Sequence, residues 1–221
     1  MEIKELALML LEGSRETLYM TIFSTFFAYV LGVPIGVLLV VTPAKGLRPI
    51  PIVNKLLNAL TNIVRPIPFV IFLIAVMPLT KAVVGRTYGP TATVMPLVLA
   101  AAPFVARMVE SSLMEVDAGV IEAAQSMGAS PMQIIWKVLL PEAKTSLITG
   151  ATIALATILG YSAMAGVVGG GGLGDIAIRF GYYRYQTDIM VITVILLIIY
   201  VQVFQAIGTK LAKVTDKRIK E

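Results

Sequence analysis

Long uncharged apolar runs recur along the chain, and each is long enough to cross the hydrocarbon core of a bilayer. A membrane-spanning helix needs about 20 predominantly apolar residues. Five stretches approach or exceed that length, at residues 17–44, 56–80, 87–106, 145–174 and 189–209. The pattern predicts an all-α integral membrane protein with five transmembrane helices. Residues 17–209 then form one transmembrane domain, after an extracytoplasmic segment at 1–16 and before a basic cytoplasmic tail at 210–221.

Composition agrees with a membrane protein and narrows its chemistry. The chain is 57% hydrophobic and 14% charged, whereas soluble domains average about 45–50% apolar and about 25% charged residues. It contains no cysteine and no histidine, which removes disulfides, thiolate nucleophiles, imidazole bases and most zinc sites. No carboxylate lies inside a predicted span. We therefore expect no catalytic residue, no metal site and no cofactor in this chain.

The distribution of lysine and arginine predicts how the chain crosses the membrane. Eleven basic residues fall in 45–55, 107–144 and the tail from 210 onward, and six fall in the segments expected on the other side. Basic residues concentrate in cytoplasmic loops. The N-terminus is thus predicted outside and the C-terminus inside, on the cytoplasmic face of the membrane. The tail fits either the end of an exit helix or a surface segment in contact with lipid.

The segment between spans three and four, residues 117–143, carries unusually dense helix signals. Asp117 is suited to cap a first helix, and Gly128 suits the left-handed residue that ends it. Ser130 precedes a proline and stands three residues before a glutamine, which predicts a capping box for a second helix. Pro141 is expected to end that helix after Leu140. The segment is therefore predicted to be two short helices joined by a tight turn.

Three interpretations fit such a module: a plain connector, a DNA-reading helix-turn-helix, and a docking element for a soluble partner. Four acids against Lys137 alone between residues 115 and 142 argue against nucleic acid, which requires clustered basic residues. A face of small residues, Ala123, Ala124 and Ala129, beside Gly128 would allow another protein to approach closely. These residues favour docking over a connector.

The E-A-A-x-x-x-G pattern followed by V-L-L-P resembles the EAA loop of ABC importer permeases of the binding-protein-dependent type. Val138 stands where that family usually has isoleucine, a volume-conserving change. In the family this loop forms the coupling helix, which sits in a cleft of an ATP-hydrolysing subunit. The resemblance implies an ATPase-coupling role for Glu122, Ala123, Ala124, Gly128, Ala129, Ser130 and Pro141.

Further stretches at 65–69, 102–110, 160–166 and 172–174 are similar to methionine-importer permeases in particular. The resemblance implies the type I ABC importer permease fold and a partnership with a second copy of the chain. It also implies two ATP-binding subunits that hold ATP and magnesium, an extracytoplasmic substrate-binding protein, and D/L-methionine as the transported amino acid. The alternatives are a permease for another small amino acid or organic solute, and a stand-alone secondary transporter.

Four residues in the predicted spans are candidates for the translocation path. Met164 is framed by small residues, which suits either a gate in a narrow pore or ordinary packing. Tyr161 and Ser162 offer hydroxyls that could contact an amino acid. Arg65 is the one ionised side chain inside an apolar run. The prolines after it favour an interfacial position, at the end of an amphipathic helix beginning near Val53, over a substrate contact.

The glycine run at 169–174 has the G-x-G-x-x-G spacing of a dinucleotide loop. It follows a predicted span instead of a strand, so nucleotide binding is rejected. Either it unwinds the outer end of span four, exposing backbone carbonyls, or it forms an ordinary turn. Without a nucleotide site the chain must obtain energy from a partner. A secondary transporter is disfavoured because intramembrane acids and inverted repeats are not evident.

Overall fold

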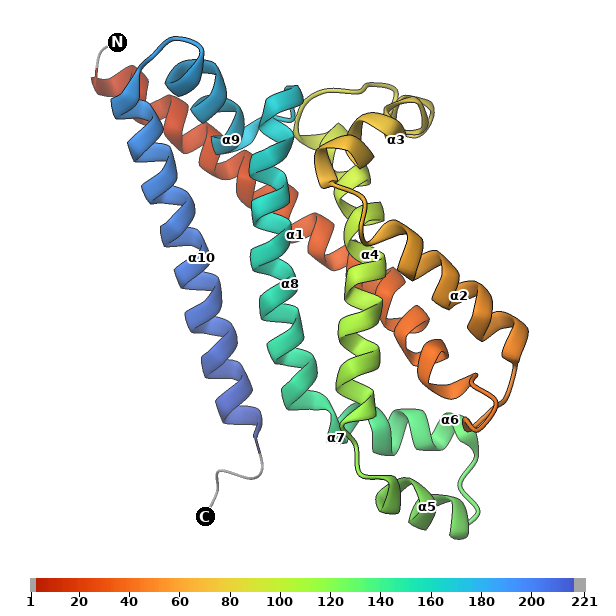
Figure 1. The fold of residues 1–221 in the computed structure, drawn as a ribbon. Coiled ribbons are helices and arrows are strands. Elements are labelled where there is room, and N and C mark those ends of the chain that lie inside the picture. Colours follow the sequence, from red (N-terminus) through yellow and green to blue (C-terminus); the bar gives the residue numbers. More distant parts are fainter. Residues whose placement is uncertain (1–2, 217–221) are drawn as a thin grey trace. The chain divides into compact units, whose positions relative to one another are not determined.

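The computed structural model describes residues 3–216, and all regular secondary structure in that range is helical. Four of its helices are long and apolar enough to cross a membrane, or up to five spans if one broken pair counts as a span. Figure 1 shows these helices in sequence colours. The elements are α1 (Ile3–Val41), α2 (Pro51–Val64), α3 (Phe69–Val84), α4 (Pro90–Met114), α5 (Ala118–Ser126), α6 (Pro131–Ile134), η1 (Ile135–Leu139), α7 (Leu140–Glu142), α8 (Lys144–Ala165), η2 (Gly166–Val168), α9 (Gly172–Ile176), η3 (Ala177–Tyr182) and α10 (Thr187–Thr215).

The first and last helices extend beyond the predicted spans. α1 begins at Ile3, so residues 3–16 form the start of this helix and not a separate segment. Their leucines, methionine and glutamates are good helix formers, and charge alone does not end a helix. α10 continues to Thr215 and so includes the first part of the predicted tail. Residues 217–221 of that tail lie outside the described residues.

The predicted second span, 56–80, is two helices and not one. α2 ends at Val64 and α3 begins at Phe69. Pro66 and Pro68 lie in the break, where proline removes a backbone donor and restricts the residue before it. Arg65 follows directly after α2 and is exposed. The sequence favoured a position for Arg65 at the end of a separate helix, and α2 does end directly before Arg65.

The predicted fourth span, 145–174, ends early because the chain unwinds at the glycine run. α8 stops at Ala165, and Gly169, Gly171 and Gly172 all have positive φ. This confirms unwinding over an ordinary turn. The backbone folds so tightly that a Cβ on Gly166 would overlap the backbone of Gly174 and Asp175.

The chain divides into two compact units, and four of its helices contribute to both. The first unit comprises Met1–Phe27, Ile67–Ala101 and Ala154–Gln205, and the second comprises Ala28–Pro66, Ala102–Ile153 and Ala206–Glu221. In the second unit, Gly36 of α1 allows α4 to approach closely, since a Cβ there would lie 2.7 Å from the Ala106 oxygen. This close packing is the role that glycine commonly has in membrane helices.

In the first unit, side chains of α1 and α4 satisfy the unwound backbone. The Gly172 N–H donates to Glu16 Oε2 at 2.7 Å, and the Leu173 N–H donates to Thr17 Oγ1 at 2.8 Å. The Thr93 hydroxyl donates to the Gly170 oxygen at 3.2 Å. Backbone groups within a membrane need partners inside the protein. The carbonyl of Gly170 is thus engaged, where the sequence suggested that the unwound carbonyls would be exposed.

We expect Thr17→Val to lower the free energy of unfolding by about 1–3 kcal/mol, because the buried Leu173 N–H loses its acceptor. Thermal unfolding of the purified protein in detergent measures this. Thr25→Val is the matched control, since the Thr25 hydroxyl donates only within its own helix, to the Thr21 oxygen at 2.7 Å. Equal melting temperatures for the two variants would contradict the anchoring role of Thr17.

Candidate functional site

The segment 117–143, here called the coupling module, begins as the sequence predicts. Asp117 Oδ1 accepts a hydrogen bond from the Gly119 N–H at 2.8 Å and caps α5. Gly128 has φ of +80°, and the Ala129 N–H donates to the Ala124 oxygen at 3.1 Å. This is the hydrogen bond of a helix end closed by a left-handed glycine. The turn between the two helices is therefore fixed by backbone geometry.

The second helix of the module starts with the predicted capping box. The Gln133 N–H donates to Ser130 Oγ at 3.4 Å, and the Ser130 N–H donates to Gln133 Oε1 at 2.8 Å. Pro141 does not end the helix, however, because the helical run continues to Glu142. The chain adopts π-helical geometry at Ile135–Leu139, and Pro141 then falls in the first turn of α7, where an N–H is not needed.

The exposed face of the module differs from the face of small residues that the sequence predicted. Glu122, Ala123, Gly128, Ser130 and Pro141 are exposed. Ala124 is only 5% exposed and Ala129 is half-buried. Ala124 is buried because the end of α5 packs against the helical run that follows. It therefore cannot be part of an exposed small-residue face.

Large apolar side chains form an exposed patch on the module that sequence reasoning missed. Met127, Met132 and Trp136 are 81%, 61% and 66% exposed. Trp136 is the only tryptophan of the chain. Tryptophan and methionine are enriched at protein interfaces, and methionine adapts to irregular surfaces. The four-residue spacing of Met132 and Trp136 was the available signal for this patch.

A cavity of about 930 Å³ adjoins the module within the second unit and is lined by the ends of α4, α8 and α10. Its charged lining residues are Glu115, Asp117, Glu142, Lys144 and Asp216. Four acids against one lysine give it a negative lining. This charge agrees with the sequence argument against nucleic acid, since phosphates require a basic surface.

A second polar cluster, around Arg107 of α4, was also missed. Arg107 Nη2 donates to Asn58 Oδ1 and to Asn62 Oδ1, both at 2.8 Å, and Nη1 pairs with Glu110 Oε2 at 2.6 Å. Asn58 in turn donates to Asn54 Oδ1 at 3.0 Å. The three asparagines recur every four residues and so share one face of α2, which was readable from the sequence. The cluster ties α2 to α4.

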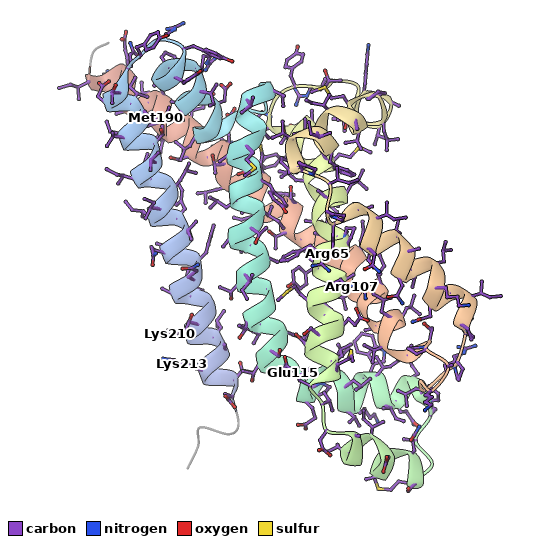
Figure 2. The ribbon with its side chains drawn as sticks, in the orientation of Figure 1. Arg65, Arg107, Glu115, Met190, Lys210 and Lys213 are labelled. Carbon is purple, nitrogen blue, oxygen red and sulfur yellow. The ribbon has the colours of Figure 1, made fainter. Side chains whose placement is uncertain are left out.

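The asparagine face also reaches α1. Asn54 Nδ2 donates to the Leu39 oxygen at 3.1 Å and to Thr42 Oγ1 at 3.2 Å. Opposite it, Ile52, Leu56, Leu60 and Ile63 of α2 are exposed. α2 is therefore amphipathic, with amides turned to the protein and an apolar stripe turned away. Figure 2 labels Arg107 together with Arg65, which lies beyond the end of this helix.

The candidate path residues lie near the end of α8, in the first unit. The Tyr161 ring stacks on Phe69 with centroids 4.7 Å apart and planes 5° apart. Ser162 is 1% exposed, and its hydroxyl donates to the Leu159 oxygen at 2.8 Å. Met164 is 49% exposed. Of the three, Met164 is therefore the side chain that extends most freely from the helix.

A cluster of carboxylates that could hold a metal ion is not found within residues 3–216.

The comparisons with known proteins match nearly the whole chain. Residues 32–221 match the family model described as the binding-protein-dependent transport system inner membrane component. The chain belongs to this family. Its match extends across the coupling module and the glycine run.

The relatives agree with one another in what they are named. A protein of Vibrio cholerae named a probable D-methionine transport system permease protein is 49% identical over 95% of this chain and 93% of its own length. Its counterpart in Escherichia coli K12 is 49% identical over 72% of this chain and 73% of its own length. A solved chain of the MetNI methionine ABC transporter in an inward-facing conformation is 44% identical, with a TM-score of 0.95, covering 98% of this chain and all of that one.

We expect Arg107→Gln to lower the free energy of unfolding by about 3 kcal/mol, because it leaves Glu110 unpaired in a site where both side chains are mostly buried. Arg179→Gln is the matched control. Its ion pair with Asp175 spans 3.2 Å, and the arginine side chain is 57% exposed, so its loss should cost less than about 1 kcal/mol. Thermal unfolding in detergent measures both; equal losses would contradict a structural role for the Arg107 cluster.

Proposed function

We propose that this chain is the permease subunit of an ATP-driven methionine importer in the bacterial cytoplasmic membrane. The family match, the relatives named as D-methionine permeases and the likeness to a chain of a methionine ABC transporter support the proposal. The observation that carries it is the coupling module: a capped, exposed two-helix element with the E-A-A and G pattern, in a membrane protein of this family.

The coupling module explains how a chain without a nucleotide site could use ATP. Two such subunits would each present a module to an ATP-binding subunit, which would hold ATP and magnesium and hydrolyse it. The turn at Gly128 and the capping box at Ser130 hold the two short helices to each other through hydrogen bonds. The module would therefore pass a movement of the ATP-binding subunit on to the membrane helices. Met127, Met132 and Trp136 would supply apolar contact area, and exposed Glu122 would add a charged contact.

The path for the amino acid would lie between two copies of the chain, with an extracytoplasmic binding protein delivering the substrate. Met164 would narrow this path, because its flexible thioether side chain is about half exposed. Tyr161 would shape the wall beside it through its stack on Phe69. Ser162 would serve the helix more than the substrate, since its hydroxyl is already engaged.

The proposed topology has the N-terminus outside and the C-terminus inside. It rests on the excess of basic residues in the segments that flank and include the coupling module. The same orientation turns the coupling module and the acidic cavity toward the cytoplasm, where an ATP-binding subunit would be found. Arg65, exposed after α2, would then lie at the cytoplasmic interface.

We expect Gly128→Trp to lower the rate of ATP-driven methionine uptake at least tenfold. It should also reduce the amount of ATP-binding subunit that co-purifies with the permease. The substitution forces a bulky side chain into left-handed geometry on the proposed docking surface. Gly85→Trp is the matched control, since Gly85 also has open surroundings and a φ of +84° but lies outside the module.

Glu122→Lys serves as a second variant, because it reverses an exposed charge and leaves the backbone unchanged. It too should uncouple uptake, while its melting temperature stays that of the wild type. If both module variants transport as well as the Gly85 control, the coupling role is wrong.

A further inference from the structure

The turn before α10 holds two arginines against one aromatic ring. Arg179 Cζ lies 5.2 Å and Arg184 Cζ lies 4.6 Å from the centroid of the Phe180 ring. Both distances are in the range of cation–π attraction. Because each guanidinium carbon lies within about 5 Å of the same centroid, the two carbons lie no more than about 10 Å apart. A phosphate group carries several acceptor oxygens, so one such group lying between the two guanidinium groups could accept hydrogen bonds from both.

The charge of this pair is only partly neutralised. Asp175 pairs with Arg179 at 3.2 Å. In the described part of the chain, no ion pair is found for Arg184. Asp188 lies nearby in sequence, but it is exposed in the first turn of α10, where a carboxylate is favoured by the helix dipole. A positive charge thus remains available on Arg184, with Arg179 exposed beside the same ring.

The backbone that presents these side chains is unusual. Tyr185 has φ of +56°, the one non-glycine residue with positive φ among residues 3–216. The Gln186 N–H donates to the Phe180 oxygen at 3.2 Å, which closes the turn around Tyr185. A non-glycine residue in this conformation costs on the order of 1 kcal/mol or more. Such strain is retained where a particular presentation of side chains has a use.

The turn lies at the end of a membrane-spanning helix. α10 begins at Thr187 and is one of the apolar candidate spans. Gly181 packs so closely on α10 that a Cβ there would lie 2.8 Å from Met190 Cβ; Figure 2 labels Met190. Tyr182, Tyr183 and Tyr185 are 63%, 66% and 88% exposed. Exposed tyrosines flanking a span are typical of the headgroup region of a bilayer.

The neighbouring stretch of α1 exposes large apolar side chains among charged ones, which favours lipid over an acidic protein as the occupant. Leu6, Met9 and Leu10 of α1 pack on the core cluster that also contacts Phe180. Figure 1 shows this part of α1 beside the turn between α9 and α10. On its other side the same stretch of α1 exposes Ile3, Leu8 and Leu11, which are 88%, 59% and 68% exposed. Apolar side chains and arginines together match the boundary between acyl chains and phosphates.

We propose that Arg179 and Arg184 bind the phosphodiester of an anionic phospholipid headgroup, with the exposed tyrosines packing beside its glycerol region. The site depends on the membrane character of the chain and not on what the chain transports. It is also independent of which leaflet faces the turn.

Native mass spectrometry of the full-length chain in detergent tests this site with added phosphatidylglycerol, phosphatidylcholine or inorganic phosphate. Wild type should retain phosphatidylglycerol in preference to phosphatidylcholine. Each arginine near an anionic lipid surface contributes to the free energy of lipid binding. The double variant Arg179→Gln/Arg184→Gln should therefore bind phosphatidylglycerol with an affinity lower by about tenfold or more. Phe180→Leu, which keeps both charges but removes the ring, should weaken binding by a smaller factor.

Lys81→Gln/Arg86→Gln is the matched control, because it removes two positive charges elsewhere, from the last turn of α3 and the connection that follows it. This control should bind phosphatidylglycerol as wild type does. The arginine double variant should lose less than about 1 kcal/mol of stability with its exposed ion pair, so a melting temperature close to that of wild type shows that it is folded. Equal loss in the control and the double variant would overturn the site, because it would indicate only a general effect of net charge.

Two other outcomes would also overturn the proposal. In the first, inorganic phosphate binds wild type but not the double variant, and wild type shows no preference between the two lipids. That result would assign the arginine pair to a free anion. Unchanged lipid binding with lost capture of the extracytoplasmic binding protein would assign it to an acidic protein surface.

Discussion

A backbone amide or carbonyl that leaves a helix inside a membrane must find a partner in the protein, and this constraint governs how the structure is built. Where α8 unwinds, Glu16 and Thr17 of α1 accept the freed amides, and Thr93 of α4 donates to a freed carbonyl. These contacts make the glycine run a fixed element of the first unit. An irregular segment next to a proposed path therefore depends on polar side chains of two neighbouring helices.

The second unit meets the same constraint with asparagines and an arginine. Asn54 donates to a carbonyl near the end of α1, and Asn58 and Asn62 accept from Arg107. Polar groups turn to the protein, and the apolar stripe of α2 turns away. In the coupling module, caps and a left-handed glycine satisfy the helix ends. The helix ends of the module are therefore satisfied by its own side chains and backbone, which is compatible with the proposed role as a docking surface.

Local rules predicted much of this structure. The caps at Asp117 and Ser130 follow from side chains that bond their own backbone, and the turn at Gly128 follows from the freedom of glycine at positive φ. For the glycine run the sequence left unwinding and an ordinary turn open, and its partners lie on α1 and α4. The errors arose from tertiary contacts and from alternative helical hydrogen bonding. Burial of Ala124 depends on how two short helices pack, and the π-helical turn before Pro141 has no clear sequence signature. The Asn54, Asn58 and Asn62 face was readable from its four-residue spacing, but its partner Arg107 lies 45 or more positions away.

The central claim is that this chain imports methionine only as part of an ATP-driven complex. The most direct measurement is uptake of labelled methionine into proteoliposomes that contain this permease together with the proposed ATP-binding subunit and the proposed extracytoplasmic binding protein. The account predicts accumulation that requires all three proteins and ATP, and that excess unlabelled methionine suppresses. Accumulation of methionine by this chain alone, driven by an ion gradient, would contradict the account. A complex that takes up other amino acids with ATP but does not take up methionine would also contradict it.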